Sequence, residues 1–127
     1  MKFHFDPSAG LVVVRARLVG PAVDMLTDLE LDTGATTSVI SWSSAVALGY
    51  DPAAVPERVP VTTGSGIEYC PLLELQQFEA LGRVVESLEV LCHDLPARSR
   101  VRGLIGINFL RSFDVRINFK QGFISLG

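Results

Sequence analysis

One carboxylate stands out because of the residues that surround it. Asp32 ends a segment in which Leu29 and Leu31 are apolar, and Thr33 and Gly34 follow it. Glycine can adopt a positive φ angle and lets its backbone N–H approach an anionic oxygen, while a threonine hydroxyl can hydrogen-bond the backbone and stiffen a turn. A carboxylate in such a turn is fixed in direction yet accessible, as general acid–base catalysis requires. Asp-Thr-Gly is also an ordinary turn sequence, so the rest of the chain must decide.

Two further segments have patterns that could surround this carboxylate. Residues 103–110 place two apolar residues before Gly106 and then enter a short helical pattern. Residues 61–69 hold Gly64, Ser65 and Gly66 between two β-prone arms, which is typical of a mobile hairpin tip. Either pattern alone is common, because a capped buried strand explains the first and any glycine hairpin explains the second.

Together and in this order, the three segments resemble the retropepsin family, the single-domain aspartic proteases of retroviruses and their bacterial relatives. In that family the Asp-Thr-Gly strand and a later apolar-apolar-Gly strand cross under the active site, and a hairpin flap closes over the substrate. The resemblance covers residues 10–119 of this chain. Residues 120–127 continue past the point where the viral enzymes end, so the dimer geometry of those enzymes does not transfer directly.

The resemblance implies an aspartic endopeptidase whose active site is shared by two identical chains. Aspartic proteolysis uses two carboxylates about 3 Å apart that share one proton, and a two-fold dimer can supply the second Asp32. The threonine of the family motif hydrogen-bonds across the two-fold axis, a role that the resemblance assigns to Thr33. The expected site residues are the catalytic Asp32; the active-site turn and dimer support Thr33 and Gly34; the substrate-binding residues Ala35, Thr63, Gly64, Ser65 and Gly66; and the supporting residues Leu104, Ile105 and Gly106.

Two other functions are alternatives to the endopeptidase. A retropepsin-like fold could serve as a dimerisation or peptide-binding module with little turnover, since a fold does not fix a function. The intact Asp32, Thr33 and Gly34 favour the enzyme. A serine hydrolase is not supported, because Thr63 replaces the first glycine that a Gly-x-Ser-x-Gly elbow around Ser65 would need.

The sequence indicates neither a cofactor nor a metal centre. Its two cysteines, Cys70 and Cys92, and its two histidines, His4 and His93, include no pair with the spacing of zinc ligands. Free buried cysteines are common in reducing compartments, so two thiols are favoured over a disulfide. We therefore expect no metal and no cofactor.

The elements that must position Asp32 are mostly strands. Apolar and polar residues alternate along five segments with a period of two, which is typical of half-buried strands. The alternation predicts a compact all-β domain built from hairpins, and the resemblance adds that the strands close into a barrel. The alternating segments are residues 14–18, 28–32, 73–76, 87–90 and 113–119.

Two short helices are expected to interrupt the strands. Ser41 can cap a helix that runs through Leu48, with Gly49 as its left-handed stop, and residues 107–112 form another. Residues 50–60, with three prolines, predict an extended connector, and residues 122–126 predict one more strand.

Length and composition limit the remaining possibilities. A chain of 127 residues, 48% of them hydrophobic, suits one domain with an apolar core, so we expect a single domain over residues 1–127, complete or excised from a longer chain. The net charge of −3 and the scattered basic residues argue against nucleic acid as a partner. No apolar stretch approaches the roughly 20 residues of a membrane span, and the N-terminus lacks the apolar region of a signal peptide. We expect a cytoplasmic protein whose partners are a second copy of itself and a protein or peptide substrate.

Overall fold

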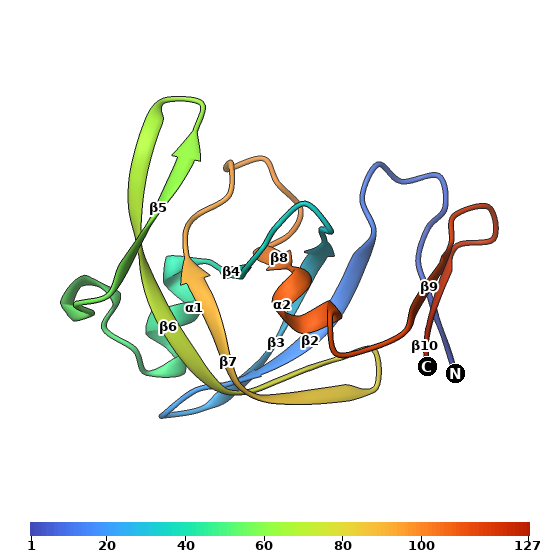
Figure 1. Ribbon diagram of the computed structural model, residues 1–127, viewed down its shortest axis with the longest axis horizontal. Helices are drawn as coiled ribbons and strands as arrows, with labels where there is room; N and C mark the ends of the chain where they lie inside the picture. Colours follow the sequence, from blue (N-terminus) through green and yellow to red (C-terminus); the bar gives the residue numbers. More distant parts are fainter.

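The structure is a computed structural model that describes residues 1–127. Strands dominate it (Figure 1). The strands are β1 (Lys2–His4), β2 (Val13–Val19), β3 (Asp24–Leu31), β4 (Ser38–Ile40), β5 (Arg58–Thr63), β6 (Gly66–Ala80), β7 (Arg83–Cys92), β8 (Gly103–Ile105), β9 (Val115–Asn118) and β10 (Phe123–Leu126). The helices are α1 (Trp42–Leu48), the 3₁₀-helix η1 (Pro52–Ala54) and α2 (Ile107–Leu110).

Six of the strands close into a barrel. They follow the order β2-β3-β8-β4-β7-β6, and β2 also pairs with β6, so the ladder of hydrogen bonds returns to its start. The first part of the long strand β6 pairs with β5 and the rest pairs with β7. The β5–β6 hairpin therefore projects from the barrel, as Figure 1 shows. The prediction of an all-β barrel built from hairpins is confirmed.

Residues that alternate along the strands fill the barrel interior. In β2 the side chains of Val14, Ala16 and Leu18 are buried, while Arg15 lies outside and forms an ion pair of 3.1 Å with Asp28 on β3. The buried side chains belong to one apolar core of 19 residues. Burial of this apolar surface is the main driving force for folding, and the exposed ion pair adds little to it.

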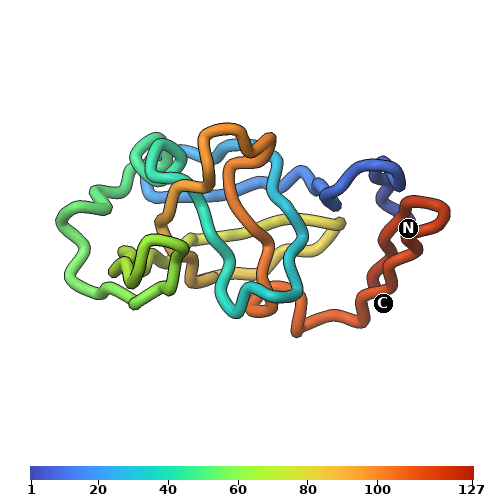
Figure 2. The backbone as a smooth tube through the Cα atoms, turned by 90° about the horizontal axis from the view of Figure 1, so that it is seen from above, coloured from blue at the N-terminus to red at the C-terminus, as the bar shows by residue number.

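A second, smaller sheet stands beside the barrel. Its strand order is β1-β10-β9, and both pairings are antiparallel. The two chain ends therefore lie next to each other, at the opposite end of the molecule from the β5–β6 hairpin (Figure 2). Strand β10 confirms the additional strand expected after residue 122, although β9 is shorter than the predicted segment 113–119. Phe113 instead packs against Phe109, with ring centroids 5.2 Å apart.

The first helix begins and ends as predicted. The Ser41 hydroxyl accepts a hydrogen bond from the Ser44 N–H, and Gly49 takes a φ of 106° at the C-cap. The second helix ends at Leu110 rather than Ser112, because the chain turns there toward β9. None of the helices has the length and hydropathy needed to cross a lipid bilayer.

The prediction of an extended connector over residues 50–60 is wrong in part. Pro52 opens the 3₁₀-helix η1, a position where proline is tolerated. Residues from Arg58 onward already belong to β5, where Pro60 pairs with Tyr69. Because β5 lies at the edge of its sheet, a proline without an N–H can be accommodated there.

Candidate active site

Asp32 follows the last residue of β3, in a turn that backbone hydrogen bonds hold together. Its Oδ1 accepts the Gly34 N–H at 2.8 Å, and its carbonyl accepts the Ala35 N–H at 3.2 Å. Its own N–H donates to the carbonyl of Ile105 at 2.9 Å. The carboxylate is thus fixed in direction and stays partly exposed.

Two details of this turn differ from the sequence-based expectation. Gly34 does not adopt a positive φ; glycine suits the position because a Cβ would lie only 3.1 Å from the Asp32 Oδ1. The Thr33 hydroxyl makes no hydrogen bond within the chain, and Thr33 is exposed. Backbone amides, rather than the threonine side chain, therefore stiffen the turn within one chain.

Strand β8 lies between β3 and β4, directly under the turn. Leu31 pairs with Ile105 in parallel, and Val39 pairs with Leu104 in antiparallel fashion. Ile105 is fully buried. The three residues expected to support the site, Leu104 to Gly106, are accordingly brought next to Asp32.

A polar network centred on the buried Ser38 lies behind the turn and is missing from the sequence-based description. The hydroxyl of Ser38 accepts the Gly106 N–H at 2.9 Å and donates to Asn108 Oδ1 at 2.9 Å. The same Oδ1 accepts the Ser38 N–H at 2.8 Å, and Asn108 Nδ2 donates to the Glu89 carbonyl at 2.7 Å. These four residues tie β4, α2 and β7 together. Ser38, a polar residue at the start of the otherwise apolar segment 38–40, could have indicated this network from the sequence.

We expect Asn108→Ala to lower the free energy of unfolding by about 1–3 kcal/mol, because it leaves the buried N–H and hydroxyl of Ser38 without an acceptor. Urea unfolding measures this. Asn118→Ala is the matched control, since Asn118 accepts an exposed turn N–H from Gln121. Equal losses for the two variants would show that the network does not stabilise the turn.

An apolar cavity of about 440 Å³ lies between the Asp32 turn and strand β5. Its wall includes two residues to which the resemblance assigned roles: Ala35, expected in the substrate cleft, and Leu104, expected beneath the site. Strand β5 contributes the opposite wall, which the sequence did not predict. The lining residues are Ala35, Thr36, Thr37, Val39, Val59, Pro60, Val61, Leu91, His93, Leu95 and Leu104.

The tip of the β5–β6 hairpin lies beyond this cavity. Thr63 Oγ1 donates to the Gly66 carbonyl at 3.0 Å and accepts the Ser65 N–H at 3.3 Å, and Gly66 has a φ of 125°. Gly64 has no atom within 4 Å of the position of an added Cβ. Residues 63–66 do not line the cavity, and their contact with substrate stays a prediction.

A second carboxylate lies close to Asp32. Glu30 is partly buried at the end of β3, opposite Leu104 of β8. Burial raises the pKa of Glu30 above its usual value, and the negative charge of Asp32 raises it further. Glu30 therefore keeps its proton to a higher pH than an exposed glutamate does.

The residues considered as zinc ligands are divided between different parts of the fold. His4 lies in β1, and Cys92 faces the main core, where burial raises its thiol pKa to about 12. Cys70 and His93 come together, with the Cys70 sulfur 3.6 Å from the His93 Nδ1. Both cysteines are free thiols.

Comparison with known proteins agrees with this geometry. Residues 14–109 match the model of a family described as "Aspartyl protease". A solved structure of a retropepsin-like aspartic protease from Rickettsia conorii is similar with a TM-score of 0.75 and 19% sequence identity, over 99% of this chain and 88% of that chain. No curated protein matches the sequence. At this identity the structural likeness establishes a retropepsin-like fold.

Proposed function

Because the chain belongs to the aspartyl protease family, we propose that it is an endopeptidase that acts as a homodimer, with one Asp32 from each chain at a shared site. One observation carries the proposal. The Asp32 carboxylate is held by the Gly34 N–H at 2.8 Å and stays partly exposed, beside an apolar cavity. A two-fold dimer is the simplest way to bring a second such carboxylate to it.

The proposed reaction uses the pair of Asp32 side chains as acid and base. Two carboxyl groups about 3 Å apart hold one proton between them, because both cannot ionise at that distance. The ionised group takes a proton from a water molecule as the water oxygen attacks the carbonyl carbon of the peptide, and the other group donates its proton to the carbonyl oxygen. When the tetrahedral intermediate collapses, the first group gives the proton that it took from water to the amine nitrogen as the C–N bond breaks. The second group takes a proton back from a hydroxyl of the intermediate, which restores the starting pair. No covalent bond to the protein forms.

The surroundings of Asp32 suit an extended peptide. The cavity between residues 35–37 and residues 59–61 could take an apolar side chain. Strand β5 lies at a sheet edge, so its free backbone groups could pair with a peptide by strand addition. Thr33 is exposed, so its hydroxyl is accessible for the proposed hydrogen bond across the two-fold axis.

Dilution tests the shared site. We expect the specific activity on a mixed peptide library to fall as the protein is diluted through its dimer dissociation constant, because one chain alone lacks the carboxylate pair. Sedimentation at the same concentrations gives the dimer fraction. A chain that is monomeric throughout and still cleaves peptides would contradict the proposal. A verified dimer without cleavage between about pH 4 and 8 would favour a peptide-binding module instead.

Glycine at the hairpin tip is expected to matter for turnover. Gly66→Ala places a side chain at a φ of 125°, which L-residues rarely adopt, so we expect a several-fold lower kcat/KM with a smaller relative effect on thermal stability. Gly64→Ala is the control, because an added Cβ meets no atom within 4 Å at either glycine and Gly64 does not have a positive φ. Replacing both glycines with valine should impair turnover further. Wild-type turnover in all three variants would show that the hairpin tip does not contribute to substrate binding.

A further inference from the structure

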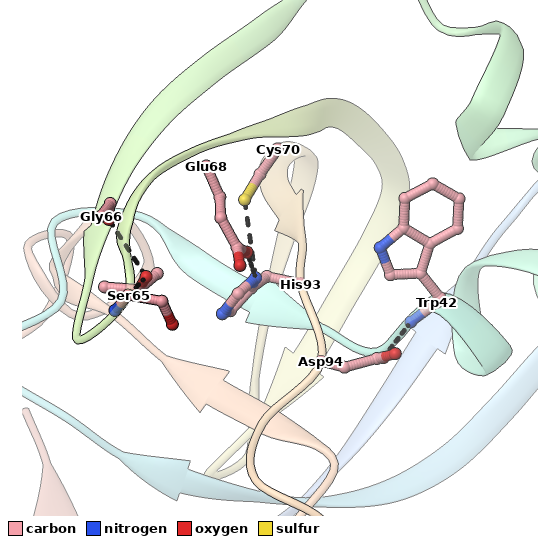
Figure 3. Close-up of polar contacts among 8 residues, drawn as sticks. Trp42, Ser65, Gly66, Glu68, Cys70, His93 and Asp94 are labelled. Carbon is pink, nitrogen blue, oxygen red and sulfur yellow. Dashed lines mark hydrogen bonds and ion pairs between the residues drawn. The ribbon is translucent and has the colours of Figure 1, made fainter.

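Three potential metal ligands converge where the β5–β6 hairpin joins the barrel. Glu68 and Cys70 lie two residues apart on β6, so their side chains share one face of the strand. His93 follows β7, and the register in which Leu72 pairs with Leu91 brings it opposite Cys70. Figure 3 shows the three side chains pointing toward one another. Their ligand atoms all lie within 4.8 Å of one another.

Two of the three separations between these atoms match those around a tetrahedral zinc ion. Zinc binds sulfur at about 2.3 Å and nitrogen or oxygen at about 2.0–2.1 Å, so a tetrahedral angle separates sulfur from nitrogen by about 3.6 Å and nitrogen from oxygen by about 3.3 Å. The Cys70 sulfur lies 3.6 Å from His93 Nδ1, and Glu68 Oε2 lies 3.3 Å from the same nitrogen. The Glu68 side chain is exposed and can rotate to adjust the third separation, which is within 4.8 Å.

The backbone around two of the ligands is already anchored. The His93 N–H donates to the Ile40 carbonyl at 3.0 Å, and the next side chain, Asp94, accepts the Trp42 N–H at 2.9 Å (Figure 3). Cys70 is 3% exposed and its residue pairs with Val59 of β5. A metal ion would therefore meet a thiol and an imidazole whose positions the fold has largely set, which reduces the entropic cost of binding.

We propose that Glu68, Cys70 and His93 form a zinc-binding site, with water or a substrate group as the fourth ligand. Zinc binds sulfur, imidazole and carboxylate donors, whereas hard cations such as Mg²⁺ and Ca²⁺ prefer oxygen ligands. The site departs from the expectation of no metal, which rested on sequence spacing. A bound ion would join strand β6 to the end of β7, beside the cavity that His93 lines.

Metal titration of the reduced, purified protein tests the site. We expect one Zn²⁺ per chain in competition with a chromophoric chelator, and one Co²⁺ per chain with a thiolate-to-cobalt charge-transfer band. Cys70→Ser should remove the band, and His93→Gln and Glu68→Gln should each weaken Zn²⁺ binding at least roughly tenfold. Cys92→Ala and His4→Gln are the matched controls and should bind as wild type does. Because Glu68 is exposed, Glu68→Gln remains informative even where another variant folds poorly.

Absence of stoichiometric Zn²⁺ binding would overturn the proposal. Folded Cys70→Ser and His93→Gln variants that bind Zn²⁺ as tightly as wild type would overturn it too. An ion bound at the base of the β5–β6 hairpin should also change peptide cleavage. This consequence rests on the proposed function and is measured separately. Zn²⁺ should inhibit peptide cleavage by wild type and not by Cys70→Ser. Inhibition that survives Cys70→Ser would place the inhibitory ion elsewhere, while a protein that binds Zn²⁺ and cleaves no peptide would contradict the protease and keep the metal site.

Discussion

Replacing Asp32 with asparagine is expected to lower peptide cleavage by at least about a thousandfold, while the fold and the dimer persist. Asparagine keeps the shape of the side chain and an Oδ1 that can still accept the Gly34 N–H, which is 2.8 Å away in the wild type. It cannot act as the acid or base of the proposed pair. The measurements are kcat/KM on a cleavable peptide, the melting temperature and the sedimentation coefficient.

Asp28→Asn is the matched control for this experiment. Asp28 lies on the same strand but is exposed outside the barrel, where it pairs with Arg15 at 3.1 Å. Its loss should leave cleavage nearly unchanged, because an exposed ion pair contributes at most about 1 kcal/mol to stability. Near wild-type cleavage by a folded Asp32→Asn protein would show that Asp32 does not take part in the reaction.

The largest expected effect on stability is that of Gly103→Ala. A Cβ on Gly103 would lie 2.0 Å from the Val39 carbonyl oxygen, and the neighbouring atoms are backbone of β4 and the side chain of Leu29. To relieve this clash, β8 must move away from β4, which breaks the pairing of Val39 with Leu104. We expect the free energy of unfolding to fall by at least about 3 kcal/mol.

Urea unfolding of Gly103→Ala and of Gly10→Ala provides the comparison. An added Cβ at Gly10 meets no atom within 4 Å, so its substitution should change stability by no more than about 0.5 kcal/mol. Similar unfolding midpoints for the two variants would show that β8 is not packed between β3 and β4 as described. The same displacement of β8 should also disturb the Asp32 N–H, which donates to Ile105.

Much of the framework around Asp32 could be predicted because it depends on local sequence. The alternation of apolar residues along β2 and β3 follows from the period of a strand, and Ser41 and Gly49 mark the ends of α1 through their own caps. The placement of β8 beside β3 rested on the resemblance rather than on periodicity. A segment of three residues carries too little pattern to define its neighbours.

The parts that could not be predicted depend on pairings between distant strands. Residues 59–61 form a cavity wall only because β5 pairs with the first part of β6. Cys70 and His93 are 23 positions apart, and only the β6–β7 register places them opposite each other. Ser38 and Asn108 likewise meet through contacts that no short spacing reveals.

The structure of the protein bound to a statine-type peptide inhibitor tests the central claim most directly. We predict a two-fold dimer in which the two Asp32 carboxylates lie about 3 Å apart, with the statine hydroxyl hydrogen-bonded between them. The peptide should run along β5, with an apolar side chain in the cavity beside Ala35. An inhibitor held by a single chain, or two Asp32 side chains too far apart to share a proton, would contradict the account.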